Sequence, residues 1–483
     1  MPIGINRNKT KSKGASSESH DVTMLPASLA STPEGEELAG DAPGRLVDGN
    51  HKKMISRRGF LYGAAAVGAA AAVAAGVALT NRQDEDEDEI ITLEVPEDRV
   101  FTLEDCTEID PAVAFKLLGD FTLPYGSLVW ANEDSVAACL LPTDTPSPLT
   151  QMAILDLDTG EYSVPLEASV GAGEGFEIYD VRATSAGMVW TEANIFEGRW
   201  RVYSARLDET RTLGTPALLD EGDQSHETPS LAAVGDSAYW QVMPHIENEN
   251  ARTEPFVVKQ ARFGSSESTT VHKSVGRSTA PLYACSDGVA TAPRIGSGAR
   301  YWELVHVLES TGEADATITL PNGMQPSAVG FGVTGFAFCF DSIYDYGDGI
   351  SNLGTYTPST AEGNPEDSTW FRFGRTPFAS PAWCGQQWLL VKSTQSVCAI
   401  DMQAREYCAL DVDDASDDWG DYLATSGVHN TFVTFSHLDS TDSSGTETHK
   451  TQVRVWEPCS SEERATLEAE ALAAQAAEES VTA

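Results

Sequence analysis

Two acidic stretches of the chain contain the residue types that bind calcium. The first ends a strongly apolar run and places Asp341, Asp345 and Asp348 close together, with a glycine on each side of Asp348. Calcium is bound by several carboxylate and carbonyl oxygens from one flexible loop. The stretch lacks the twelve-residue spacing and terminal Glu of an EF-hand, so a solvated acidic loop is the simpler interpretation. We therefore name Asp341, Asp345 and Asp348 as candidate calcium ligands, with the solvated loop as the alternative.

The second acidic stretch extends from Asp411 to Asp421. It resembles a calcium loop less, because Ser416 stands where an EF-hand needs glycine for its sharp turn.

A carboxylate pair for glycoside hydrolysis meets in space and cannot be recognised from spacing. In a chain with 73 Asp and Glu, any proposed pair would carry little information.

Sequence motifs for other chemistries are missing. The chain has no Gly-x-Ser-x-Gly nucleophile elbow, no His-Glu-x-x-His, no phosphate-binding glycine loop and no Ser-x-Asp-x-Gly-x-x-Trp box. His245, His306, His429 and His437 fall in or near strand-like runs, and we expect them to pack singly. His429 and His437 would share a ligand only if the fold brought them together. We therefore predict no catalytic residue.

The eight cysteines show neither a Cys-x-x-Cys motif nor a zinc-binding spacing. Cys398 and Cys408 flank an expected hairpin turn and could face each other across it. For most of the eight, a buried free thiol is the simpler expectation.

The formal net charge is −42, from 73 Asp and Glu against 31 Lys and Arg. So acidic a chain repels phosphate backbones, which argues against nucleic-acid binding. A solvated acidic surface is the simplest explanation, and calcium or a cationic partner is the alternative.

A unit of about fifty residues recurs after residue 119. Each unit has a short apolar strand, a tight turn and a stronger apolar strand, and the turns lie at 132, 184, 235, 286, 332, 385 and 427. A second turn follows in several units, as in 154–162 and 399–407. Two hairpins make four strands, which is one blade of a propeller. We predict an all-β, seven-bladed β-propeller, with six or eight blades or a pair of β-sandwiches as alternatives.

The seventh unit lacks a fourth strand before an Ala- and Glu-rich tail begins. We expect the segment from Arg99 to Leu103, or that from Ile90 to Val95, to supply this strand and close the ring.

The composition predicts five regions. Residues 1–55 are a disordered cytoplasmic segment, 56–80 a signal or membrane anchor, and 81–118 an acidic linker with a possible ring-closing strand. Residues 119–458 form the propeller, and 459–483 form a helical or disordered tail. In outline, the body resembles exported bacterial propellers of the TolB-like and WD-repeat-like kinds, although no Trp-Asp signature recurs.

The segment 56–61 resembles the twin-arginine export signal, S-R-R-x-F-L-K. Ser56, Arg57, Arg58, Phe60 and Leu61 match it, and Tyr62 stands where the family usually has Lys. The uncharged run that ends at Leu79 is long enough to nearly cross a membrane. The resemblance implies the twin-arginine translocase as a partner during export. It also implies an extracytoplasmic location, either free or anchored by a single membrane helix if the signal is not cleaved.

These features favour a binding or scaffold module in the cell envelope, with an unknown envelope protein or a glycan as its ligand. The alternative is an extracytoplasmic hydrolase or lyase that acts on polysaccharides, because one fold supports many functions.

Overall fold

The computed structural model describes residues 100–482, except 250, 252, 296–300, 321–324, 334, 341–369, 372–379, 393–394 and 442–446. Two sets of predicted site residues lie outside the described residues. They are the export-signal residues Ser56, Arg57, Arg58, Phe60 and Leu61, and the candidate calcium ligands Asp341, Asp345 and Asp348.

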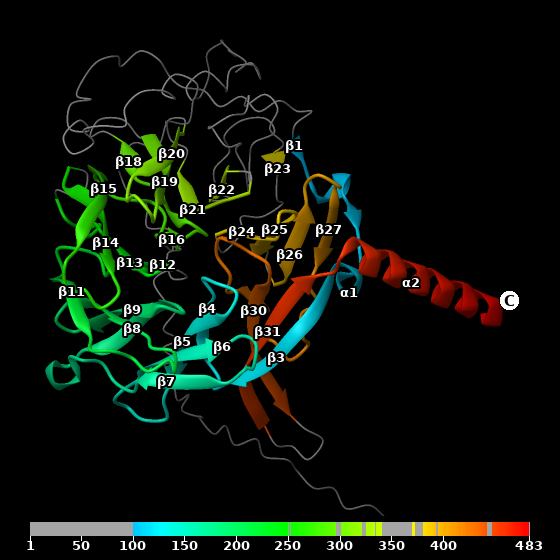
Figure 1. Ribbon diagram of the computed structural model, residues 1–483, viewed down its shortest axis with the longest axis horizontal. Coiled ribbons are helices and arrows are strands. Elements are labelled where there is room, and N and C mark those ends of the chain that lie inside the picture. The colour runs from blue at the N-terminus through cyan, green and yellow to red at the C-terminus, as the bar shows by residue number, and fades with distance from the viewer. Residues whose placement is uncertain are drawn as a thin grey trace, which may run out of the picture.

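The described chain is mostly β and forms a β-propeller, in which small sheets follow one another around a ring (Figure 1). Three four-stranded sheets come first, each with its strands in chain order from the centre outward. The first holds β4 (Leu128–Trp130), β5 (Val136–Pro142), β6 (Thr150–Asp156) and β7 (Tyr162–Leu166). The next two hold β8 (Glu177–Thr184), β9 (Gly187–Asn194), β10 (Arg199–Arg206) and β11 (Ala217–Gly222), then β12 (Leu231–Val234), β13 (Ser237–Val242), β14 (Pro255–Arg262) and β15 (Thr269–Val275).

The sheets that follow are less regular. A five-stranded sheet contains β16 (Tyr283–Ala284), β17 (Gly288–Thr291), β18 (Arg294–Ile295), β19 (Tyr301–Leu308) and β20 (Ala314–Thr319). Two short pairs come next: β21 (Pro326–Gly332) with β22 (Gly335–Phe340), and β1 (Val100–Phe101) with β23 (Trp370–Phe371).

The last two sheets include segments from distant parts of the chain. One contains β24 (Ala382–Cys384), β25 (Trp388–Lys392), β26 (Val397–Asp401) and β27 (Glu406–Ala409), extended by β2 (Thr107–Glu108) and β29 (Val428–His429). The other contains β28 (Tyr422–Leu423), β30 (Phe432–Thr441), β31 (Glu447–Pro458) and β3 (Phe115–Leu123).

The predicted turns match the first hairpin of each unit. The turns at 132, 184, 235, 286, 332 and 385 join β4 to β5, β8 to β9, β12 to β13, β16 to β17, β21 to β22 and β24 to β25. The seventh turn, at Gly427, belongs to a longer connection, residues 424–431, between β28 and β30. The sequence pattern therefore located the innermost hairpins correctly.

The strand that completes the last sheet is not the predicted one. β3 pairs antiparallel with β31 from Phe115↔Pro458 to Leu123↔Thr451. The proposed segment around Val100 instead pairs parallel with β23, and the segment from Ile90 to Val95 lies outside the described residues. The predicted start of the propeller at residue 119 falls inside β3.

The aromatic ring of Phe121 joins the completing strand to the first sheet. Gly160, in the β6–β7 turn, has a φ of +74°, and a Cβ there would lie 2.2 Å from Phe121 Cδ1. Glycine is needed both for the left-handed backbone and for the close approach of this ring. The core beside it combines buried residues of β4–β6 with Val433, Phe435 and Val455 of the last sheet. The first and last sheets thus share one core, which closes the ring.

The helices lie at the outer edge of the ring. They are the short η3 (Leu103–Asp105), α1 (Pro111–Ala114) and η4 (Ala172–Glu174), and the longer α2 (Ser461–Thr482), which points away from the ring (Figure 1). The tail, which the sequence predicts to be helical or disordered, forms α2 in the structure. Arg464 anchors the first turns of α2, with its Nη2 2.7 Å from Glu406 Oε2. Within the described ranges, none of the helices is long and apolar enough to cross a membrane.

Candidate functional site: the loop face of the ring

The ring has two faces, which differ in what connects the strands. We call the turn face the end that carries the first hairpin turns, such as 131–135 and 285–287. The loop face is the opposite end, where the innermost strands begin. It carries the longer connections 143–149, 167–176, 195–198, 223–230 and 243–254. Longer loops held by a rigid scaffold are the usual place for binding residues.

The connection 424–431 crosses the turn face. It hydrogen-bonds the first turns of two sheets and the innermost strand, β24, of a third. The bonds run from Ser426 N to Ala131 O (3.2 Å), from Val428 N to Ser286 Oγ (2.8 Å) and from Trp383 N to Gly427 O (2.8 Å). A segment that reaches all three must pass over the middle of the ring.

Gly427 makes this crossing possible. Its φ is +80°, and a Cβ there would lie 3.0 Å from the backbone of Cys285 and Ser286. The backbone therefore sits directly on the neighbouring turn, in a conformation that suits glycine.

Large apolar side chains are exposed on the loop face. Most of the exposed large hydrophobic residues in the described part of the chain lie there, and Phe196, at the tip of the β9–β10 hairpin, is fully exposed at 102%. The others are Tyr125, Leu149, Val170, Ile195, Ile246 and Trp419. At the turn-face end of the described strands, Tyr162 and Val333 are also exposed. Clustered exposed apolar residues mark interaction surfaces, whereas scattered ones need no explanation.

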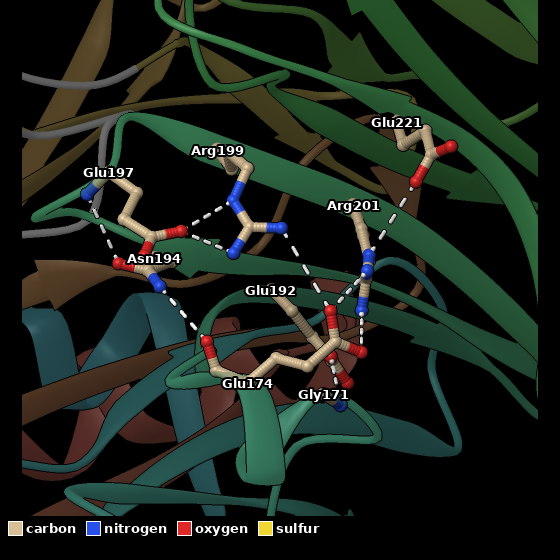
Figure 2. A network of polar contacts seen from close by, with 8 residues as sticks. All are labelled: Gly171, Glu174, Glu192, Asn194, Glu197, Arg199, Arg201 and Glu221. Carbon is tan, nitrogen blue, oxygen red and sulfur yellow. Dashed lines mark hydrogen bonds and ion pairs between the residues drawn. The ribbon is translucent and has the colours of Figure 1, made fainter.

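A buried carboxylate organises the part of the loop face around Phe196. Glu192, in β9, has no exposed surface and accepts three hydrogen bonds, of which Figure 2 shows the one from Gly171. The donors are Val170 N (2.6 Å), Gly171 N (2.9 Å) and Trp190 Nε1 (3.1 Å). Burial raises the pKa of Glu192, and these donors act in the opposite direction by stabilising the charged form. Glu192 therefore fixes the start of the loop 167–176.

Two arginines of β10 clamp the other end of that loop. The Arg201 guanidinium forms two hydrogen bonds with the Glu174 carboxylate, 2.8 and 3.1 Å long (Figure 2). It also lies 4.3 Å from the centre of the Phe176 ring, and Arg199 lies 5.1 Å from the same ring. Bidentate arginine pairs and cation–π contacts restrict side-chain orientation as well as adding energy. Phe176 is consequently held between the loop and the strand.

The hairpin that presents Ile195 and Phe196 is tied to the same network. Asn194 Nδ2 donates to Glu174 O (3.0 Å), and Asn194 Oδ1 accepts from Glu197 N (3.2 Å) (Figure 2). Glu197 in turn pairs with Arg199. The exposed apolar tip thus stands on a fixed polar base, as a binding surface requires.

The loops around this tip are acidic. The connections 143–149, 167–176, 195–198, 223–230 and 243–254 contain nine Asp and Glu and one Arg, Arg252. Arg199 and Arg201 are paired with Glu197, Glu174 and Glu221, so they leave little free positive charge. The loop face therefore presents apolar side chains in a negative field.

Three carboxylates of the second acidic stretch have partners within the protein. Arg454 lies 3.4 Å from Asp421 and 3.7 Å from Asp413, and His437 Nδ1 lies 3.4 Å from Asp417. Burial raises the pKa of Asp421, which has no exposed side chain. Across the described ranges there is no group of three or more His, Cys, Asp or Glu arranged to hold a metal ion.

The cysteine and histidine expectations have mixed outcomes. The predicted facing of Cys398 and Cys408 is wrong: Cys398 lies opposite Ala409 and Cys408 opposite Ala399, so the one-residue offset sends the two thiols to opposite faces of the sheet. All eight cysteines are free. His429 and His437 bond to different carbonyls, of Ser426 and Ser127, and do not form a shared site.

Glu192, Arg201 and Phe176 were not among the predicted site residues, because they come together only in the fold. One signal was present: Glu192 interrupts the apolar run Gly187–Asn194, and a carboxylate within a buried strand must find several donors. No motif marks the arginines, because their partner Glu174 lies in a separate loop.

Comparisons with known proteins give similarity at the level of architecture. No protein-family model matches the chain, and no curated protein sequence matches it. Among solved structures, a puromycin hydrolase is similar at 13% identity and a TM-score of 0.37, covering 66% of this chain and 52% of that one. A post-proline cleaving enzyme from Rickettsia typhi has 9% identity and a TM-score of 0.40, covering 68% and 52%. TolB from Acinetobacter baumannii has 11% identity and a TM-score of 0.34, covering 58% and 64%.

This chain thus spans about half the length of the two enzymes. These similarities are too low to bear on function, and the description of the fold rests on the strand pairing.

Proposed function

We propose that the chain is a seven-bladed β-propeller that binds a polypeptide partner in the cell envelope through its loop face. Support for seven blades comes from treating β21–β22 and β1–β23 as parts of one blade. Phe101 and Phe371 pack with Ala337 of β22 in a single core, which favours this grouping. The six other sheets then supply one blade each.

The observation that carries the proposal is the exposed apolar tip of Ile195 and Phe196 on its fixed polar base. A side chain as large and as exposed as Phe196 loses little conformational freedom on binding and buries much apolar area. The surrounding carboxylates favour a partner with positive charge, because complementary charge speeds encounter and excludes acidic competitors. The partner class is therefore a cationic protein segment that also carries apolar side chains.

The location is part of the same proposal. The segment 56–61, with Arg57 and Arg58, supports export through the twin-arginine translocase, and the apolar run after it would anchor the protein if it were not cleaved. A ring closed by β3 and β31 needs both ends of the body before it is complete, which suits a route that carries folded proteins.

The polysaccharide hydrolase or lyase alternative has less support. Glycoside hydrolysis needs two carboxylates free to act on one bond. The most buried carboxylates in the described chain already have structural partners: Glu192 binds three donors, Asp421 pairs with Arg454, and Asp180 pairs with Arg182. Binding therefore remains the function that the geometry supports best.

Site-specific photo-crosslinking tests the proposal. A benzoylphenylalanine placed at Phe196 in cells producing the full chain is expected to give a discrete adduct with one envelope protein. The matched control is Leu218, which is 41% exposed but lies on the outer strand β11. An equal adduct from both positions, or none from Phe196, would show that the loop face is not the binding surface.

A further inference from the structure

A groove lies beside the first turns of α2, the helix that projects from the outer edge of the ring (Figure 1). It has a volume of about 810 Å³ and is bounded by α2, α1 and the strands β3 and β31. Leu117 of β3 and Trp456 of β31 line it, in one cross-strand row with Phe432. Phe432 directly follows the connection 424–431, which crosses the turn face. The groove is therefore at the opposite end of the last sheet from the loop face.

The floor of the groove is apolar and only partly covered. Leu117 is 46% exposed, and Trp456 and Leu467 are half-buried. Beside them, Phe115 and Leu410 are buried in the core between the last two sheets. Exposed apolar side chains that line a hollow mark an interaction site, whereas single scattered ones do not. A partner in the groove would cover Leu117, Trp456 and Leu467.

The helical wall of the groove is held in place at its start. Ser460 N donates to Glu463 Oε2 (2.7 Å), and Glu463 N donates to Ser460 Oγ (3.3 Å), which makes a capping box. Glu463 Oε1 also lies 3.2 Å from Lys116 Nζ, so the same residue ties α2 to β3. A wall that is already fixed lowers the entropy cost of binding against it.

Two cations line the groove, and both already have carboxylate partners. Lys116 Nζ lies 2.8 Å from Glu457 and 3.2 Å from Glu463. Arg454 pairs with carboxylates of the second acidic stretch. Three further carboxylates line the groove and form no ion pair with any residue that the structure describes; they are Asp411, Glu462 and Glu470. The groove thus combines free negative charge with an apolar floor.

Two of the free carboxylates are arranged along α2. At about 1.5 Å of rise per residue, Glu462 and Glu470 are about 12 Å apart along the helix axis. A second hollow, of about 510 Å³, runs beside them and is bounded by Ala465, Ala469 and Ala473. Side chains this small let a second helix pack closely. A helix laid along α2 can therefore place two basic residues, about two turns apart, against Glu462 and Glu470.

We propose that this groove binds a basic amphipathic helix of a partner protein. The apolar face of that helix covers Leu117, Trp456 and Leu467, which is the helix-in-groove mode of recognition. Its basic residues pair with Glu462 and Glu470, and this complementary charge selects against acidic helices. A second copy of α2 does not meet this requirement, because α2 contains six Glu and one Arg.

Photo-crosslinking on the full-length chain tests the proposal. The probe is a synthetic helical peptide of leucine and lysine with its leucines on one face, and the chain carries benzoylphenylalanine at Leu117. A peptide adduct is expected at this position. At Leu118, which is 52% exposed in the same strand but outside the groove, the yield should be on the order of tenfold lower.

Substitutions elsewhere in the chain show which surface holds the peptide at Leu117. Leu467→Asp should lower the Leu117 adduct on the order of tenfold, whereas Phe196→Asp, on the loop face, should leave it unchanged. Glu470→Gln should raise the peptide concentration that gives half of the maximal adduct by about two- to fivefold. Glu468→Gln is its matched control, because Glu468 lies on the same helix outside the groove, and it should have no effect.

Three results would overturn the proposal. The first is a Leu117 adduct no stronger than that at Leu118. The second is an equal adduct with a peptide in which glutamate replaces lysine. The third is a crosslink from Leu117 to a second copy of the chain or to residues 1–80 of the same chain, since either would identify a different occupant.

Discussion

Replacing Phe115 by alanine is expected to lower the free energy of unfolding by about 3–5 kcal/mol. Phe115 begins β3, is 2% exposed and packs against Phe432 and Trp388, with ring centres 5.0 and 5.1 Å away. It therefore joins the completing strand to the cores of the last two sheets. Removing its ring leaves a cavity at the point where the two ends of the body meet.

The control is Leu118→Ala in the same strand. Leu118 is 52% exposed, so its truncation should change stability by about 0.5 kcal/mol or less. Urea unfolding of both variants, followed by tryptophan fluorescence, measures the difference. Equal destabilisation by the two substitutions would mean that β3 does not close the ring through its buried face.

Replacing Glu192 by alanine is the second substitution with a large expected effect, about 3 kcal/mol or more of lost stability. Three donors would lose their acceptor: Gly171 N and Trp190 Nε1, which are buried, and Val170 N, which is partly buried. Each unsatisfied buried donor costs about 1–3 kcal/mol, although such costs do not simply add. The loop 167–176 would also lose its attachment to β9.

Glu197→Ala is the matched control, since Glu197 is exposed and pairs with Arg199 on the surface. It should cost about 0–1 kcal/mol. Hydrogen exchange of the 167–176 amides distinguishes the two variants: we expect faster exchange in Glu192→Ala and unchanged exchange in Glu197→Ala. A Glu192→Ala protein with wild-type stability and exchange would contradict the proposed role of the buried carboxylate.

The repeat could be predicted because turns leave a strong local signature. Gly235 and Gly385 have positive φ at predicted turn positions, and each lies at the turn of a first hairpin. The second hairpin turn was also recognisable: Gly160 and Arg405 occupy matching positions, and both have positive φ. The blades could therefore be predicted from turn residues that are recognisable in the local sequence.

The contacts between distant segments could not be predicted in the same way. β3 completes a sheet whose other strands lie about three hundred residues later in the chain. Nothing in the sequence of β3 identifies β31 as the strand with which it pairs. Thr107–Glu108, which adds to the edge of β27, gives no local sign of its partner either. Such pairings depend on which exposed edges the finished ring leaves open.

The polar networks could not be predicted from the sequence for a related reason. Glu192 reaches the loop 167–176, Arg201 reaches Glu174 and His306 reaches Asp315, and no fixed spacing links these pairs. A buried polar residue predicts that partners exist, because an unpaired one is costly, but it does not identify them. These residues come into contact only in the folded structure.

The most direct test of the loop-face account is whether separate loops act as one surface. A photo-crosslinking residue at Ile246, which is 63% exposed on the next sheet, is combined with Phe196→Asp or with Leu218→Asp. Phe196→Asp adds charge to the apolar tip and should reduce the Ile246 adduct on the order of tenfold or more, as for loss of a binding hot spot. Leu218→Asp should leave it unchanged. An Ile246 adduct of equal yield in both variants would contradict a common binding surface.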